Sequence, residues 1–210
     1  MTEREEEAVT FVIDDDELVR ASLADLLRSV SISAQVFASP REFLDCKRPD
    51  TAACIVLDVR LPGGSGLEFQ RALAKAGIDL PVIFITGHGD IPMSVRAMKT
   101  GAVAFLTKPL REQELLDAVY AGIERDRSRR TRNQRLAELR KRLASLTTRE
   151  REVLPLVVSG RPNKQIAEDL KLSEMTVKVH RSHIMRKMQA RSLVDLVRMA
   201  DQLGVSAEES

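Results

Sequence analysis

Short apolar runs, many of them rich in β-branched residues, alternate with helical patterns over residues 8–110. Between the first two runs, apolar side chains recur every three or four positions, which is the spacing of one helix face. Alternation of this kind indicates an α/β fold with a parallel sheet covered on both faces. Right-handed crossovers then predict a doubly wound, five-stranded sheet in the order 2-1-3-4-5. The predicted strands are Val9–Ile13, Ala34–Phe37, Cys54–Leu57, Val82–Ile85 and Val103–Leu106.

A long helix is predicted from Arg111 to Leu146, where helix breakers are almost absent from the sequence. Its apolar stripe runs from Leu115 to Ile123, stops over the polar, arginine-rich segment 124–135, and resumes at Leu136. We therefore expect the middle of the helix to be surrounded by water. A flexible charged linker is the alternative, because a polar stretch gives a helix little tertiary support.

The remaining chain predicts an all-α domain of four helices. Thr147–Glu150 has the pattern of a capping box, and Gly160 follows the helix that it opens, within which Pro155 should cause a kink. Further helices are expected over Asn163–Leu170, from Ser173 to Met188, and over Ser192–Leu203. The predicted organisation is a first domain over residues 1–122, a helical linker over 123–142 and a second domain over 143–210.

Charge and composition separate the two halves. Residues 1–110 hold 12 Lys and Arg against 16 Asp and Glu, whereas residues 111–210 hold 21 against 15. A basic second half suggests a polyanion as its partner. The acidic start and the lack of any apolar run of about 18 residues predict a cytoplasmic protein with no membrane contact. Cys46 and Cys54 are then expected to be small buried residues rather than a disulfide.

Polar side chains follow four of the predicted strands at the same sheet edge. Asp14–Asp16 follow the first strand, Asp58 ends the third, Thr86 ends the fourth and Lys108 follows the fifth. Ligands bind at this edge of a doubly wound sheet, where the strand order reverses. Carboxylates that lie close together are best tolerated around a hard cation such as Mg²⁺. With a hydroxyl and an ammonium nearby, they predict a phosphoryl site at which the Asp58 carboxylate could attack phosphorus.

These residues resemble the receiver domain of two-component response regulators over residues 8 to about 122. The similarity rests on four segments in order: Phe11–Asp16, Leu57–Gly63, Ile85–Asp90 and Phe105–Leu110. The resemblance implies a flavodoxin-like fold in which Asp58 accepts a phosphoryl group from a sensor histidine kinase. It also implies that Mg²⁺ or Mn²⁺ is held by Asp15, Asp58 and the backbone carbonyl of Arg60, with Asp14 acting through water. By the same resemblance Lys108 pairs with the phosphate, Thr86 and Phe105 rearrange together as the switch, and the Lys108–Pro109 bond is cis.

A phosphatase of the haloacid dehalogenase type is the competing enzyme interpretation, because Asp14 and Asp16 match the start of its motif with Asp14 as the nucleophile. That motif requires Thr or Val where this chain has Leu18, and it leaves Asp58 without a role. We therefore expect the protein not to be an enzyme.

The helices from Asn163 to Met188 have the pattern of a helix-turn-helix. Val177, Ile184 and Met188 form the inward face of the second helix, and the opposite face is expected to read bases in the major groove of promoter DNA. Two further side chains near helix N-termini are expected to contact phosphates. The predicted DNA contacts are Lys178, Val179, Ser182 and Arg186 on the opposite face, and Lys164 and Thr176 near the helix N-termini.

Residues 143–205 resemble the LuxR-type DNA-binding domain through Leu146–Leu154, Gly160–Ala167 and Leu172–His180. The whole chain is therefore similar to the FixJ/NarL type of response regulator. Because a single helix-turn-helix makes few base contacts, we expect phosphorylation to cause dimerisation and promoter binding. RNA polymerase is expected as a further partner. Pro162 departs from the pattern, because a capping Ser is common there, and this puts the start of the second helix in question. A constitutive DNA-binding regulator whose receiver only contacts proteins is the alternative function.

Overall fold

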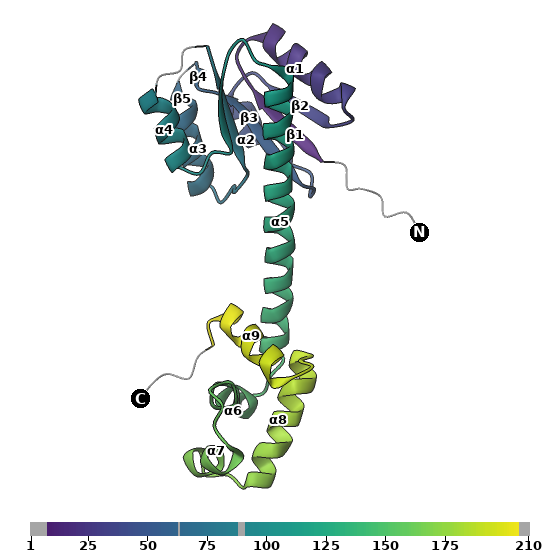
Figure 1. The fold of residues 1–210 in the computed structure, drawn as a ribbon, viewed down its shortest axis with the longest axis vertical. Helices are drawn as coiled ribbons and strands as arrows, with labels where there is room; N and C mark the ends of the chain where they lie inside the picture. Colours follow the sequence, from purple (N-terminus) through teal and green to yellow (C-terminus); the bar gives the residue numbers. More distant parts are fainter. Residues whose placement is uncertain (1–7, 63, 88–90, 206–210) are drawn as a thin grey trace. The chain divides into compact units, whose positions relative to one another are not determined.

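The N-terminal unit is built on a five-stranded parallel sheet (Figure 1). The computed structural model describes residues 8–62, 64–87 and 91–205, and the chain divides into two units, residues 1–130 and 131–210. The strands are β1 (Val9–Ile13), β2 (Ser33–Phe37), β3 (Ala53–Asp58), β6 (Val82–Thr86) and β7 (Ala104–Thr107). Their order is β2-β1-β3-β6-β7, so the predicted topology is confirmed. His88–Asp90 of the third receiver segment and Gly63 of the second lie outside the described residues.

Helices cover both faces of this sheet (Figure 1). Side chains alternate along β3, so that Ile55 and Leu57 join one core while Cys54 and Val56 join the other. The first core is closed by α2 (Pro40–Asp45), α3 (Gly66–Lys75) and α4 (Ile91–Lys99). The second is closed by α1 (Glu17–Ser29) and the first part of α5 (Glu112–Ala144).

A short antiparallel hairpin follows β3 and was not predicted from the sequence. It consists of β4 (Arg60–Leu61) and β5 (Gly64–Ser65). Strands of two residues are too short to show an alternating pattern, which explains the omission. Ser65 then caps α3 in a reciprocal capping box with Glu68, so the hairpin leads directly into the helix.

The predicted long helix is confirmed as α5, which is a single helix of 33 residues. The expectation that its polar middle is surrounded by water is wrong at Asp126, whose exposed fraction is 0%. Asp126 binds the beginning of β3, a partner 73 positions earlier in the chain. No helix in the part of the chain that the structure describes is long and apolar enough to cross a membrane.

The C-terminal unit contains the four helices that the sequence predicts around a core of its own. Thr147 and Glu150 form the expected capping box at the start of α6, and α7 begins at Asn163 with Pro162 in the N-cap position. The turn before α8 is made by Lys171 in the left-handed conformation (φ 54°). The helices are α6 (Thr148–Val158), α7 (Asn163–Leu170), α8 (Glu174–Met188) and α9 (Leu193–Leu203).

Of the two cysteines, Cys54 is buried as expected, whereas Cys46 is only half-buried. Both are free thiols. Burial raises the pKa of the Cys54 thiol to about 12, so this residue stays protonated at neutral pH.

Candidate functional site

Three carboxylates gather where β1 and β3 end. Asp14 follows β1 and is fully buried, Asp58 is the last residue of β3 and is 6% exposed, and Asp15 is exposed. One carboxylate oxygen from each of the three lies within 4.8 Å of the others. The sheet order explains this, because β1 and β3 are neighbours and their carboxyl ends share one edge. The cluster is compatible with a divalent cation, since hard cations prefer carboxylate oxygens.

Lys108 connects two of these carboxylates. Its Nζ atom donates to Asp14 Oδ2 and to Asp58 Oδ2, at 2.7 Å in both cases. Lys108 follows β7, two strands away from β3, and its amide donates to the carbonyl oxygen of Thr86 at the end of β6. The Lys108–Pro109 bond is cis, as the resemblance implies.

Burial and charge act in opposite directions on the pKa values of this cluster. Burial raises the pKa of Asp14 above its usual value, and the Lys108 ammonium lowers it by less than burial raises it. Burial alone would lower the pKa of Lys108, but the carboxylates of Asp14 and Asp58 prevail and raise it. Lys108 is therefore a firmly charged ammonium at neutral pH, placed beside the Asp58 oxygen that faces it.

Backbone amides fix the two buried carboxylates. The amide of Asp16 donates to Asp14 Oδ1, and the amide of Arg60 donates to Asp58 Oδ1, at 2.9 Å in both cases. The side chain of Asp16 itself accepts from the first amides of α1, so it serves as a helix cap and not as a member of the cluster. The two cluster residues each keep a second carboxylate oxygen directed to Lys108.

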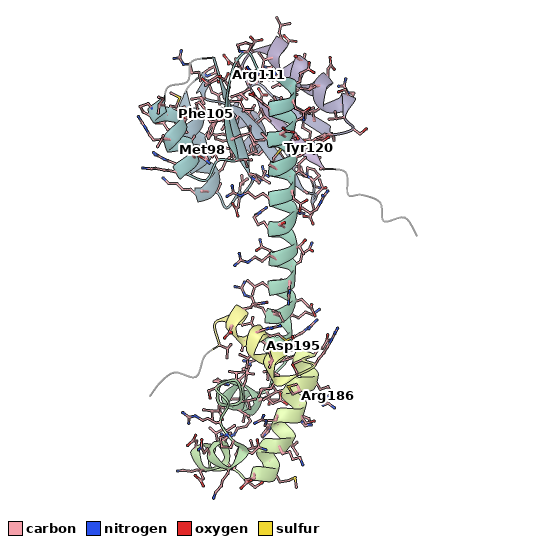
Figure 2. The ribbon with its side chains drawn as sticks, viewed as in Figure 1. Met98, Phe105, Arg111, Tyr120, Arg186 and Asp195 are labelled. Atoms are coloured by element: carbon pink, nitrogen blue, oxygen red, sulfur yellow. The ribbon has the colours of Figure 1, made fainter. Side chains whose placement is uncertain are left out.

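Thr86 and Phe105 lie on neighbouring strands beside the acidic cluster. Thr86 ends β6 and is fully buried. Phe105 lies on β7, packs partly buried against the core, and has its ring centroid 6.4 Å from that of Phe84 (Figure 2). The predicted switch pair is thus on adjacent strands, with the hydroxyl at the sheet edge and the aromatic ring two residues further from it.

The second candidate site is the outward face of α8 in the C-terminal unit. Lys178, Val179, Ser182 and Arg186 are all exposed, and Arg186 is labelled in Figure 2. Lys164 is exposed in the first turn of α7. Thr176 differs, because its hydroxyl bonds the Ser173 hydroxyl at 2.8 Å and is half-buried within the helix cap. Met175 was not singled out from the sequence, yet it lies in the first turn of the same helix with 69% of its surface exposed.

The inward face of α8 is held by a buried carboxylate. Glu150 of α6 accepts from Lys187 Nζ at 2.6 Å, and His183 Nδ1 lies 3.5 Å from its other oxygen. Arg181 donates to Asn163 of α7 at 3.0 Å. These polar contacts fix α8 against α6 and α7, so that the exposed side chains stand on a rigid helix.

Comparison with known proteins decides the family. Residues 10–120 match the model of the response regulator receiver domain. The chain belongs to this family. Residues 144–200 of this response regulator also match the model described as bacterial regulatory proteins, luxR family. The chain is therefore a phosphorylation-dependent transcriptional response regulator with a LuxR-type DNA-binding domain, and not an enzyme.

Relatives of the response regulator extend over nearly its whole length. Nodulation protein W of Bradyrhizobium diazoefficiens is 54% identical and covers 100% of this chain and 92% of its own. The transcriptional regulatory protein FixJ of Azorhizobium caulinodans is 46% identical and covers 93% of this chain and 92% of its own. Among solved structures, the response regulator StyR is 46% identical, with a TM-score of 0.83 over 93% of this chain and 99% of the other.

Proposed function

We propose that Asp58 is the phosphoacceptor of this response regulator. The observation that carries the proposal is the position of its carboxylate, which belongs to the acidic cluster and accepts a hydrogen bond from the Lys108 ammonium. An Asp58 oxygen would attack the phosphorus of a phosphohistidine on a sensor kinase, the N–P bond would break, and the imidazole would leave and take up a proton. The product is an acyl phosphate on Asp58. Lys108 can then bind a phosphoryl oxygen in place of the Asp58 oxygen.

Asp14, Asp15, Asp58 and the backbone carbonyl of Arg60 would hold Mg²⁺, or Mn²⁺ in its place, with Asp14 acting through water. A divalent ion bound there neutralises phosphoryl oxygen charge during transfer. The donor set consists of hard oxygen atoms, which fits either ion. Asp14 and Asp58 each receive a backbone N–H bond, so both carboxylates are already oriented.

Phosphotransfer is tested by incubating the full chain with acetyl phosphate and Mg²⁺ and measuring the intact mass. We expect one added phosphoryl group on the wild type and none on Asp58→Asn. Omission of Mg²⁺ should prevent labelling. Continuous hydrolysis of a phosphomonoester that survives Asp58→Asn and is lost in Asp14→Asn would favour the phosphatase interpretation instead.

We further propose that the outward face of α8 reads bases in promoter DNA while Lys164 and Thr176 contact phosphates. N-terminal residues of a recognition helix contact base edges, and Lys178 and Val179 lie in one turn of that face with Ser182 in the next. Arg186 extends this face into the last turn of the helix. The Thr176 hydroxyl already forms a hydrogen bond with the Ser173 hydroxyl, in which either group can donate. A hydroxyl has one donor hydrogen, so Thr176 can donate to a phosphate when it accepts from Ser173.

A pair of substitutions separates base contacts from phosphate contacts. Lys178→Ala should weaken binding to a duplex selected from a random library by about 1–3 kcal/mol and relax preference at one base position. Lys164→Ala should weaken binding to selected and unrelated duplexes alike. If both variants lower affinity without changing the preferred sequence, the assignment of Lys178 to a base is wrong.

Phosphorylation is proposed to act through dimerisation on the face formed by α4, β7 and α5. This face carries exposed apolar side chains, including Met98 of α4 and Tyr120 of α5, each 49% exposed (Figure 2). Thr86 and Phe105 would report the phosphoryl group to it. A single helix-turn-helix makes few base contacts, and two copies raise affinity. A second contact is therefore proposed on α9 through Leu193 and Val197, whereas Leu196 and Ala200, expected from the sequence to share it, are buried and cannot take part.

Sedimentation velocity with and without acetyl phosphate tests the dimerisation step. The unphosphorylated chain should be mainly monomeric at micromolar concentration, and phosphorylation should shift it towards the dimer. An equal dimer fraction in both states would contradict this and favour release of a masked recognition helix.

The expected partners are a sensor histidine kinase, promoter DNA and RNA polymerase, all accessible from the cytoplasm. If the protein is instead a constitutive regulator, the Asp58→Asn variant should bind DNA as well as the wild type does with acetyl phosphate.

A further inference from the structure

The part of α5 that follows Ile123 is bound to the receiver by a buried carboxylate. Asp126 has no exposed surface. Its Oδ2 atom accepts a hydrogen bond from the amide of Ala53, the first residue of β3, at 3.0 Å. Its Oδ1 atom accepts from Nε and Nη2 of Arg129, at 2.9 and 2.5 Å. Every oxygen of this buried charge therefore has a donor, and the guanidinium compensates its charge.

Three arginines around Asp126 reach the three loops that lead into β3, β6 and β7. Arg129 Nη1 donates to Asp79 before β6 at 3.3 Å, and Arg125 Nη1 donates to the carbonyl oxygen of Gly101 before β7 at 3.0 Å. Arg130 forms an ion pair with Asp50 before β3. The arginine-rich segment is thus attached to the amino-terminal edge of the sheet, opposite to the edge that carries Asp58.

These contacts differ in strength. Asp50 and Asp79 are largely exposed, and exposed ion pairs contribute little because water competes for both charges. The bond between Asp126 and the Ala53 amide is buried, and an amide without an acceptor at that depth would be strongly unfavourable. Asp126 is therefore the contact on which the attachment of this segment depends.

We propose that Asp126 is a positioning residue that makes residues 124–130 of α5 a fixed part of the receiver. The strand that it binds, β3, carries the Asp58 carboxylate at its other end. A change in β3 on phosphorylation would thus act on the segment through which the receiver continues into the rest of the chain. This second step rests on the proposed phosphorylation of Asp58, whereas the attachment itself does not.

Hydrogen exchange of the full, unphosphorylated chain tests the attachment. Asp126→Ala should raise exchange of the Ala53 amide and of the α5 amides over residues 124–134 by about tenfold or more. The matched control is Glu124→Ala, which removes exposed contacts with Arg127 and Ser128 within α5 itself. Asp126→Asn keeps an acceptor for Ala53 and loses the charge, so it serves if the alanine variant does not fold. Asp126→Asn should raise hydrogen exchange of the 124–134 amides while the Ala53 amide stays protected.

Unchanged exchange over 124–134 in both Asp126 variants would overturn the proposal. The coupling step is measured as the ratio of DNA affinities with and without acetyl phosphate. This ratio should fall in Asp126→Asn, while the rate of phosphorylation stays within about twofold of the wild type. An unchanged ratio would refute coupling through Asp126 and leave the attachment standing. If the wild type is not labelled at Asp58, the proposed acceptor fails, and the exchange result still decides the attachment.

Discussion

Gly66, the first residue of α3, lies against the backbone at the end of β3, the strand that carries Asp58. Its amide donates to the carbonyl oxygen of Val59 at 2.9 Å. A Cβ atom at this position would lie only 2.4 Å from the carbonyl oxygen of Asp58, which is closer than real Cβ atoms approach. The obstacle is a backbone atom and cannot move aside as a flexible side chain would. The absence of a side chain at Gly66 therefore allows α3 to approach the acidic cluster.

Gly66→Ala is expected to lower the free energy of unfolding by about 1–3 kcal/mol, because β3 or α3 must shift to accept the methyl group. The helix propensity of Ala offsets less than about 1 kcal/mol of this. Urea denaturation of the N-terminal unit within the full chain provides the measurement. Gly87→Ala is the control, since a Cβ atom there meets nothing within 4 Å. Equal denaturation midpoints for the two variants would show that the contact is unimportant.

The residues of the acidic cluster could be predicted because they follow strands whose order is fixed by the topology. Asp14, Asp58 and Lys108 each end or follow a recognisable apolar run. Asp126 could not be predicted in the same way. It lies among arginines on a polar stretch, which has the pattern of a solvated face, and its partner is an amide 73 positions away. A backbone partner leaves no mark in the sequence.

At the scale of helices, Glu150 links the start of α6 to the last turns of α8. The capping box with Thr147 was visible in the sequence, whereas the bond to Lys187 depends on how the helices pack. Burial alone would raise the pKa of Glu150, but the Lys187 ammonium and the Thr147 amide lower it below its usual value. The folded state therefore binds this proton less readily than the unfolded chain does.

This lowered pKa predicts how stability depends on pH. The stabilisation is fully present above the ordinary glutamate pKa of 4.5 and is lost as the pH falls from there through the lower value of the folded state. Glu150→Gln should therefore destabilise the C-terminal unit by about 1–3 kcal/mol at pH 7 and much less near about pH 3. Urea titrations followed by NMR signals of that unit in the full chain measure both values.

Glu152→Gln is the control for this titration, because Glu152 is exposed and pairs with Arg149 at the surface. It should change stability little at either pH. A Glu150→Gln penalty of the same size at pH 7 and pH 3 would mean that the charge of Glu150 is unimportant and that only its hydrogen bonds contribute.

At the scale of the whole molecule, the two units differ in charge. Residues 1–130 hold 17 Lys and Arg against 21 Asp and Glu, and residues 131–210 hold 16 against 10. The net charges of −4 and +6 equal those of the halves defined at residue 110, because residues 111–130 contain as many basic as acidic side chains. The asymmetry is therefore the same at both of these boundaries and holds for the two units.

A basic DNA-binding unit predicts a strong dependence of affinity on salt, because each neutralised phosphate releases a counterion. In a plot of log affinity against log salt for the full chain, Lys164→Ala should reduce the magnitude of the slope by about one. Fluorescence anisotropy with a labelled duplex provides the measurement. Arg28→Ala removes an exposed cation from the receiver instead and should leave the slope unchanged. An unchanged slope in Lys164→Ala would remove this residue from the phosphate contacts.

The burial of Asp126 also determines where such a protein can be recombined. Regulators that exchange output modules must keep each input module intact, and the apolar stripe of α5, which ends at Ile123, suggests a crossover directly after it. A hybrid joined there would inherit the Ala53 amide from one parent and an unrelated side chain from the other in place of Asp126. Hybrids joined after Arg130 keep both partners. We therefore expect viable exchanges to cluster beyond residue 130, several residues later than the hydrophobic pattern indicates.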